Sequence, residues 1–163
     1  MPGRIQIYTD GSSIGNPGPG GYGIIMEWEG KDYVKELSKG FRLTTNNRME
    51  LLAVIIALET LKIQPMEVMV FSDSKYVIDA VQKKWVFNWE LNNYKKKKNP
   101  DLWKRFLMVY RKYNIIFKWI KGHSGHIQNE RCDHLAVDAT NNSNLKIDEG
   151  YESINNSQKS LFD

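Results

Sequence analysis

Alternating apolar and polar positions near the start of the chain predict β-strands over residues 4–42. The run RIQIYT, from Arg4, has the period of two that is typical of a half-buried strand. GYGIIMEWEG and KDYVKELSKGFRL are two more strand-like runs, joined through Gly30 and Lys31. We therefore predict a three-stranded antiparallel meander.

Further along, apolar runs with helical and strand-like patterns follow one another. TTNNRMELLAVIIALETLK predicts a helix that begins near Thr45 or Asn46, and its almost continuous apolar surface indicates burial against a sheet. MEVMVFSD predicts an apolar strand, and SKYVIDAVQKKW predicts a helix with Ser74 as a candidate cap. DLWKRFLMVYRKY, NIIFKWIKG and HIQNERCDHLAVDAT predict a helix, a strand and a final helix, whereas residues 85–100 show no clear periodicity.

The predicted order β-β-β-α-β-α-α-β-α implies one mixed sheet with helices packed on it. We expect one domain over residues 1–141. Residues 142–163 are rich in Asn and Ser, and we expect them to form a flexible, disordered tail.

Composition and charge narrow the class of protein. The 163 residues are 41% hydrophobic and 26% charged, as in globular domains, and the longest apolar run, Leu51 to Leu58, is far below the ~20 residues that span a bilayer. Cys132 is the only cysteine, and no basic-then-apolar leader precedes RIQIYTD, so we expect a cytoplasmic location and no membrane partner.

The net charge of +4 is spread unevenly along the chain. Setting aside the two lysines and four acidic residues of residues 141–163 leaves 21 basic and 15 acidic groups over residues 1–140. Such a surplus is compatible with a polyanionic partner but is weak support for one.

One short motif suggests a nucleotide site. The run Gly18-Pro19-Gly20-Gly21-Tyr22-Gly23 matches the dinucleotide fingerprint G-x-G-x-x-G. That fingerprint must lead into a helix, because the helix N-terminus receives the pyrophosphate, whereas these glycines lead into strand-like residues. Pro17 and Pro19 also lack backbone N–H donors. We therefore predict a tight hairpin connection and no dinucleotide cofactor.

Four carboxylates occur near the ends of predicted elements. Asp10 and Asp73 end strands, Glu50 lies in the first turns of the apolar helix, and Asp133 lies in the last helix, one turn after Glu130. Singly, such residues are more often turn formers or complements to a helix dipole. Together they can meet at one rim of a sheet, where mutual repulsion would raise their pKa values. A divalent cation removes that conflict, and oxygen-only ligands suit Mg²⁺ or Mn²⁺.

Five stretches of the sequence closely resemble the bacterial type 1 ribonuclease H family. They are TDGSSIGNPGPGGYG, TTNNRMEL, SDSKYV, DLWKR and KGHSGHIQNERCDHLA, in the family's order from about Ile5 to Ala139. The resemblance implies the α/β ribonuclease H-like fold, a five-stranded mixed sheet of a three-stranded antiparallel meander and two parallel strands, flanked by helices. It also implies Mg²⁺-dependent, two-ion endonucleolytic cleavage of the RNA strand of RNA–DNA hybrids, leaving 5′-phosphate and 3′-hydroxyl ends.

By the same resemblance, Asp10, Glu50, Asp73 and Asp133 are the catalytic, metal-binding carboxylates. His123, in the loop Gly122-His123-Ser124-Gly125, matches a mobile catalytic histidine, and an imidazole with a pKa of ~6.5 can move protons near neutrality. Glu130 matches an accessory acidic residue that handles metal and product.

WVFNWELNNYKKKKNP interleaves aromatic and basic residues that suit a groove for a nucleic-acid backbone. Its alternative role is a solvated loop that the tryptophans anchor. The resemblance assigns Trp85 and Trp89 to the DNA backbone, Thr45 to a DNA phosphate, and Asn16 and Asn47 to the minor groove; Lys75 replaces the family's usual glutamine. The expected substrate-binding residues are Asn16, Thr45, Asn47, Lys75, Trp85, Trp89, Tyr94, Lys95, Lys96, Lys97 and Lys98.

Two other classes of protein remain open from the sequence. One is a related metal-dependent DNA nuclease, such as a resolvase or an integrase-like enzyme. The other is a non-catalytic hybrid-binding module, for which the intact carboxylate set is poor support. We expect a monomer whose partner is an RNA–DNA hybrid.

Overall fold

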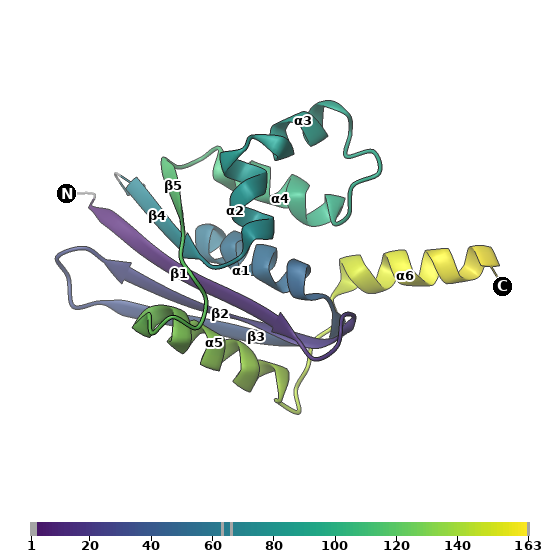
Figure 1. Ribbon diagram of the computed structural model, residues 1–163, viewed down its shortest axis with the longest axis horizontal. Helices are drawn as coiled ribbons and strands as arrows, with labels where there is room; N and C mark the ends of the chain where they lie inside the picture. Colours follow the sequence, from purple (N-terminus) through teal and green to yellow (C-terminus); the bar gives the residue numbers. More distant parts are fainter. Residues whose placement is uncertain (1–2, 63, 66, 163) are drawn as a thin grey trace.

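The computed structural model describes residues 3–62, 64–65 and 67–162. Helices lie on both faces of one central sheet, and the C-terminal helix extends away from the body (Figure 1). The layers therefore follow the predicted arrangement of one mixed sheet with helices packed on it.

The five-stranded sheet has the order β3-β2-β1-β4-β5. Its strands are β1 (Arg4–Ser13), β2 (Gly18–Trp28), β3 (Val34–Thr44), β4 (Glu67–Ser72) and β5 (Ile115–Trp119). The first three strands pair antiparallel, while β4 pairs parallel with both β1 and β5. This confirms the predicted meander and the two parallel strands.

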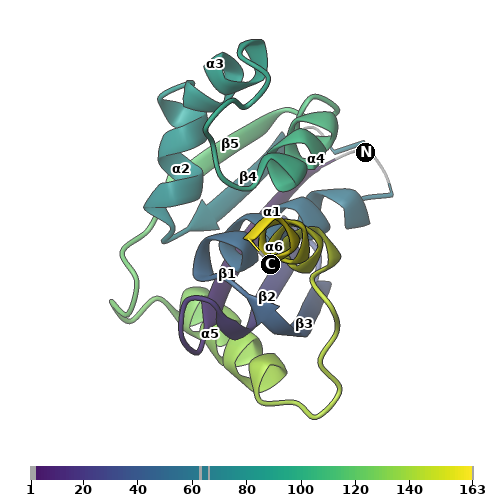
Figure 2. The same ribbon diagram turned by 90° about the vertical axis from the view of Figure 1, so that its right-hand side faces the viewer.

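Helices cover the sheet unequally. They are α1 (Asn46–Thr60), α2 (Lys75–Gln82), α3 (Trp85–Leu91), α4 (Pro100–Tyr110), α5 (Ile127–Thr140) and α6 (Glu149–Phe162). α1 packs on β1 and β2 with α4 behind it, and α5 covers the other face (Figures 1 and 2). α1 and α5 therefore flank β1 and β2 on opposite faces of the sheet.

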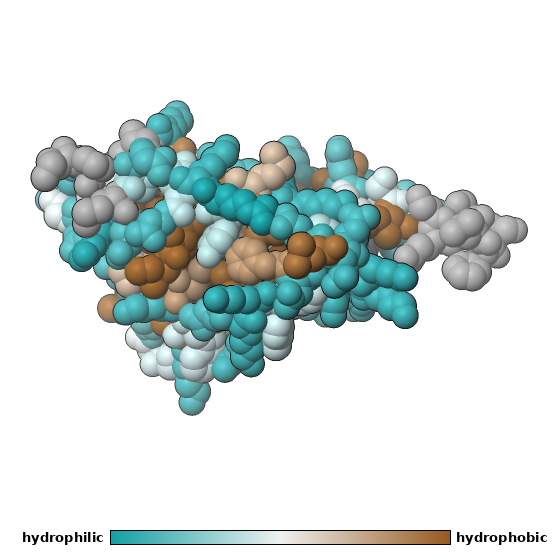
Figure 3. Space-filling model, turned by 90° about the horizontal axis from the view of Figure 1, so that it is seen from above, coloured by the Kyte–Doolittle hydropathy of each residue, from teal (hydrophilic) through white to brown (hydrophobic). Residues whose placement is uncertain are grey.

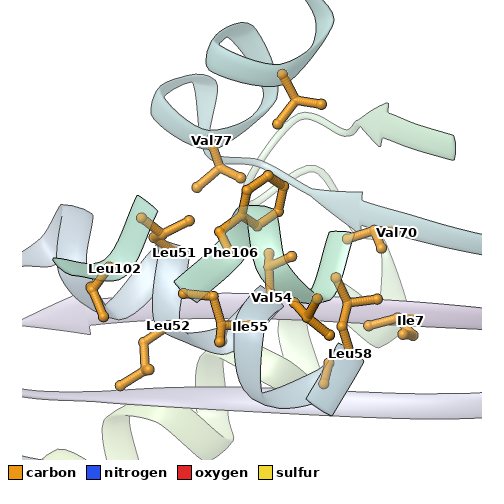
Figure 4. Close-up of a cluster of buried hydrophobic side chains, with 14 of the residues drawn as sticks. Ile7, Leu51, Leu52, Val54, Ile55, Leu58, Val70, Val77, Leu102 and Phe106 are labelled. Atoms are coloured by element: carbon orange, nitrogen blue, oxygen red, sulfur yellow. The ribbon is translucent and has the colours of Figure 1, made fainter. Parts of the chain in front are cut away.

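The helix α1 is buried almost all round, as its sequence predicts. Thr45 caps it by accepting a hydrogen bond on Oγ1 from the Arg48 N–H at 3.2 Å, and Leu51, Ile55 and Leu58 are fully buried. Figure 4 shows these apolar side chains meeting those of β1, β4, α2 and α4. This packing fixes the position of the first turn of α1.

The glycine-rich motif lies in β2, not before a helix. Gly20, Gly21 and Gly23 pair with Ser13, Ser12 and Asp10 of β1 across an antiparallel ladder. β1 and β2 do form a hairpin, but its connection is residues 14–17, and the glycines that we expected to make the tight turn lie in the β2 ladder instead. The helix that a dinucleotide fingerprint requires does not follow these glycines.

Two helices differ from the sequence-based expectation. Residues 85–91 form α3, which is too short to show a clear hydrophobic period. The segment that we expected to be a disordered tail contains α6, and Asp148 just before it is buried. The expectation of an unstructured segment was wrong because the polar composition concealed one buried ion pair, which is described below.

Within the described part of the chain, no helix is long and apolar enough to cross a bilayer.

Candidate active site

The pairing of two parallel strands brings Asp10 and Asp73 together. β1 and β4 are in a register that pairs Tyr8 with Phe71, and both chains continue in the same direction. Two residues later, the same offset sets Asp10 beside Asp73. Since side chains alternate along a strand, both carboxylates then leave the sheet on the same side.

Glu50 reaches this place because α1 lies unusually close to β1. A Cβ atom at Gly11 would collide with the backbone of Met49 and Glu50. Glycine is therefore required at this position, next to Asp10, for the first turn of α1 to approach the strand.

Three carboxylates meet as a result. Asp10, Glu50 and Asp73 each offer an oxygen within 4.8 Å of the other two, and Asp10 and Glu50 are buried. Asp133, on α5, is outside this set of three, although its charge raises the pKa values of Asp10 and Asp73. The fourth predicted carboxylate thus lies beside the cluster rather than within it.

The electrostatics of the cluster oppose ionisation. Burial, followed by the charge of Asp73, raises the pKa of Asp10 from 3.8 to about 8, although its contact with Glu50 acts in the opposite direction. Burial and the charges of Asp10 and Asp73 raise the pKa of Glu50 well above its usual range. Burial also raises the pKa of Asp73. Without a cation, the group holds protons that ordinary carboxyl groups lose.

The donor set fits a hard divalent cation. Among the described residues, the buried Glu50 Oε2 has no hydrogen-bond partner, which is a costly state for a carboxylate oxygen. Every donor of the three-residue group is oxygen, the preferred ligand of Mg²⁺ and Mn²⁺. A cation would satisfy the unpaired oxygen and remove the repulsion between the carboxylates.

The turn that carries Asp73 is fixed by contacts that the sequence did not predict. Trp119 Nε1 donates to the Asp73 carbonyl at 3.1 Å, and the Ser74 N–H donates to Ser72 Oγ at 3.0 Å. The buried Asn129 lies near Asp73, where its amide lowers the pKa of that carboxyl against the larger effect of burial. Ser72, Ser74 and Asn129 all lie in the quoted motifs SDSKYV and KGHSGHIQNERCDHLA, whereas Trp119 lies in neither.

His123 is exposed on the loop between β5 and α5, with a left-handed φ of 55°. Its charge lowers the pKa of Asp73, so it lies within electrostatic reach of the cluster. A Cβ atom on the preceding Gly122 would lie 2.5 Å from Asp73 Oδ2. The loop therefore passes close to Asp73, and it carries the exposed imidazole of His123. Glu130 is exposed on the first turn of α5.

A basic cavity of about 450 Å³ opens between α2, α3 and α4. Its lining combines lysines with aromatic rings: Lys75, Tyr76, Asp79, Trp85, Trp89, Lys96, Lys97, Lys98 and Trp103. Seen from above, on the side of α3, the molecule shows apolar side chains among hydrophilic ones (Figure 3). Lys75, which begins α2 two residues after Asp73, links the cavity lining to the strand end that carries this carboxylate.

The expected aromatic contacts divide into exposed and buried groups. Trp85 is 44% exposed, with Lys83 Nζ 5.0 Å from its ring centroid, and Trp89 lies half-buried beneath Lys97. Tyr94 is only 6% exposed and packs in the core. Its ring therefore anchors the loop, which corrects the expectation that Tyr94 offers a binding surface.

Residues at the start of α1 form a second polar surface. Asn16 Oδ1 accepts a hydrogen bond from the Asn46 N–H at 3.0 Å, which ties the hairpin loop to the helix. Asn47 is exposed beside Thr45. Asn47 lies on the helix that carries Glu50 and Thr45 caps that helix, while Asn16 lies in the hairpin loop and is tied to the helix by this hydrogen bond.

Comparisons with known proteins agree along nearly the whole chain. The RNase H family model matches residues 2–141. A ribonuclease H from Desulforamulus reducens is 52% identical over 150 residues, covering 89% of this chain and 92% of the relative. One from Trichodesmium erythraeum is 53% identical over 154 residues, covering 91% and 96%.

Solved structures show the same likeness. LC9-RNase H1, a type 1 RNase H with the type 2 active-site motif, gives a TM-score of 0.76 at 30% identity and covers 94% of this chain and 81% of its own. LC11-RNase H1 in complex with an RNA/DNA hybrid gives 0.64 at 32% identity, covering 83% and 96%.

Proposed function

This chain belongs to the ribonuclease H family, and on that premise we propose that it hydrolyses the RNA strand of RNA–DNA hybrids at Asp10, Glu50 and Asp73. The observation that carries the proposal is the meeting of these three carboxylates, from β1, α1 and the end of β4, within 4.8 Å of one another. The hybrid held by LC11-RNase H1 supports the substrate.

Asp10, Glu50 and Asp73 would hold the catalytic cation, which we take to be Mg²⁺ with Mn²⁺ as a substitute, and Asp133 would contribute to holding a second ion. When bound, such ions supply a hydroxide-like nucleophile and neutralise charge on the phosphoryl oxygens. The carboxylates supply charge and fixed geometry, since β1 and α1 hold two of them in the protein interior. The products carry 5′-phosphate and 3′-hydroxyl ends.

His123 moves a proton at its imidazole. Its exposure on a glycine-flanked loop allows the ring to approach and leave the site, and its position near Asp73 keeps it within reach of the reacting water or the leaving oxygen. Glu130, exposed on the same side of α5 as Asp133, assists metal and product handling.

The hybrid binds across two surfaces. The basic cavity takes the DNA backbone, with Trp85 and Trp89 against sugars and Lys95 to Lys98 near phosphates. Thr45, Asn16 and Asn47 contact the strands at the start of α1, where the wide minor groove of a hybrid displays the RNA 2′-hydroxyls. Lys75 lines the basic cavity, with its Nζ 4.3 Å from the centroid of the Trp119 ring.

An end-labelled RNA, annealed to DNA, tests this function. Wild-type protein with Mg²⁺ should cut the RNA internally, whereas chelation should stop cleavage and added Mg²⁺ should restore it. Asp73→Asn should be inactive under every condition. Cutting of duplex DNA instead of the hybrid would indicate a resolvase-like nuclease, and binding without cleavage would indicate a non-catalytic module.

A cytoplasmic location, a monomeric state and a catalytic domain that ends near residue 141 stay predictions from the sequence. Cell fractionation, light scattering and stepwise truncation test them in turn.

A further inference from the structure

The buried guanidinium of Arg48 joins three segments that are distant in sequence. Arg48 is 1% exposed. Its Nε and Nη2 donate to Asp148 at 2.8 and 2.9 Å, and its Nη1 and Nη2 donate to Asp101 at 2.9 and 2.7 Å. Thr44 Oγ1 also donates to Asp148, at 2.7 Å. Because an unpaired buried charge is strongly unfavourable, these bonds bind the C-terminal segment to α1 and α4.

The basic loop between α3 and α4 has a strained backbone. Asn93, Tyr94, Lys96 and Asn99 have φ angles of 54°, 58°, 61° and 61°. Non-glycine residues rarely adopt this left-handed region, so the surroundings must hold them there. The buried ring of Tyr94 is one such anchor, and Asn99 at the end of the loop is the other.

Asn99 connects the loop to Arg48. Arg48 Nη1 donates to Asn99 Oδ1 at 3.3 Å, and Asn99 Nδ2 donates to the Tyr76 hydroxyl at 3.0 Å. Trp103 Nε1 donates to the same hydroxyl at 2.9 Å. Tyr76 and Trp103 line the basic cavity, so a continuous chain of polar contacts runs from Asp148 to the wall of the proposed DNA-binding surface.

We propose that Asp148 is a positioning residue for hybrid binding, acting through Arg48 and Asn99 on the basic loop of residues 92–99. This inference rests on the proposed function. It extends the binding machinery to the C-terminal segment, which lies beyond the residues 2–141 that the family model matches.

Two variants break the chain of contacts at different links. Asp148→Asn removes the charge that faces Arg48, and Asn99→Ala removes the link to Tyr76 while leaving both ion pairs in place. Hybrid affinity is measured by fluorescence anisotropy with a chelator present, over a range of salt. KM and kcat are measured with Mg²⁺, and the free energy of unfolding is measured by denaturant titration.

Each variant should raise the Kd and KM for the hybrid by roughly tenfold and leave kcat at saturating hybrid within about twofold, because binding is impaired and the carboxylates are not. The salt dependence of binding should become shallower, since fewer lysines contact phosphates.

Two controls separate positioning from stability. Glu152→Gln breaks the exposed pair with Arg42, at 2.8 Å, on the same C-terminal helix without touching the network. Leu58→Ala leaves a cavity in the core at the far end of α1 and so lowers the free energy of unfolding. Both should bind the hybrid with wild-type affinity and salt dependence.

A double-mutant cycle identifies the loop as the target. With all four residues from Lys95 to Lys98 replaced by glutamine, Asp148→Asn should have little further effect on Kd. The proposal is overturned if Asp148→Asn and Asn99→Ala lose stability yet bind like wild type, or if their effects simply add to those of the lysine replacements. Wild-type protein that binds no hybrid would instead contradict the proposed function itself.

Discussion

At the scale of single residues, the raised pKa of the Asp10 carboxyl group makes the candidate site destabilise the cation-free folded protein near neutral pH. Its pKa is 3.8 in the unfolded chain and about 8 in the folded protein. Below pH 3.8 both states are protonated and ionisation costs nothing. As the pH rises from 3.8 through 8, the unfolded state ionises first, so stability is progressively lost.

Asp10→Asn should therefore stabilise the cation-free protein at pH 8 by a few kcal/mol, at ~1.4 kcal/mol per unit of pKa difference, while abolishing cleavage. Denaturant unfolding with a chelator, at pH 4 and at pH 8, measures the effect, which should nearly vanish at pH 4. The exposed Asp138→Asn is the matched control. A gain of equal size at both pH values would contradict the electrostatic cause.

His123→Ala should slow cleavage by roughly 10²-fold without abolishing it, because the imidazole only assists proton transfer. Single-turnover rates across pH 5–9 measure the loss and should show a flattened pH profile. The exposed His134→Ala, on α5, should leave the rate unchanged. Complete loss of activity would instead place His123 among the essential groups.

Lys75→Gln introduces the glutamine that the family resemblance led us to expect and removes a cation above the ring of Trp119. If Lys75 contacts a phosphate, KM should rise several-fold and the slope of log affinity against log salt should fall by about 1. Lys112→Gln, at the end of α4 away from the cavity, is the control. An unchanged slope would mean that Lys75 makes no phosphate contact.

At the scale of elements, Gly11 sets the spacing between β1 and α1. Gly11→Ala should destabilise the protein by about 1–3 kcal/mol, because the added methyl group meets the backbone of Met49 and Glu50. It should also lower kcat, since a displacement of ~1 Å at the site can cost ~10²-fold. Gly3→Ala, where the methyl group enters open space, should change neither unfolding nor kcat.

The elements show where sequence reasoning succeeds. The cap at Thr45, the meander and the two later strands followed from local patterns, because each has a clear hydrophobic period or a capping residue, while the parallel pairing of those two strands came from the family resemblance. α3 has too few residues to show a period, and the anchoring of the C-terminal segment depends on one aspartate that meets Arg48. Long-range ion pairs leave no local pattern.

The residues of the candidate site could likewise be predicted from the sequence only in part. The convergence of Asp10, Glu50 and Asp73 followed from their places at the ends of elements. The burial of Tyr94 and the bond from Trp119 to the Asp73 turn did not, since both depend on packing between distant segments. The sequence thus identifies the residues that carry the chemistry, but it does not identify the contacts that hold them in place.

At the scale of the whole molecule, the C-terminal segment should have two separable parts. A chain that ends at Asn142 loses Asp148 and leaves Arg48 with a single acidic partner, so we expect a loss of about 3–5 kcal/mol. A chain that ends at Asn156 keeps that pair and should lose little. Denaturant unfolding of the two truncations measures the difference, and equal stability would contradict it.

That expectation agrees with the electrostatics of Arg48. Burial lowers the pKa of its guanidinium, and the bonds to Asp101 and Asp148 more than reverse this, raising the pKa above its ordinary value. Asp101 and Asp148 thus keep the Arg48 guanidinium charged in the protein interior.

The parallel ladder between β1 and β4 has one more consequence. A slip of a single residue in that ladder would turn every following side chain of one strand to the opposite face, and Asp10 and Asp73 would part. A misregistered molecule would then have no turnover at all, however compact it was. Nuclease activity is therefore a direct assay of correct strand pairing, and the active fraction of a refolded sample counts the molecules that paired correctly.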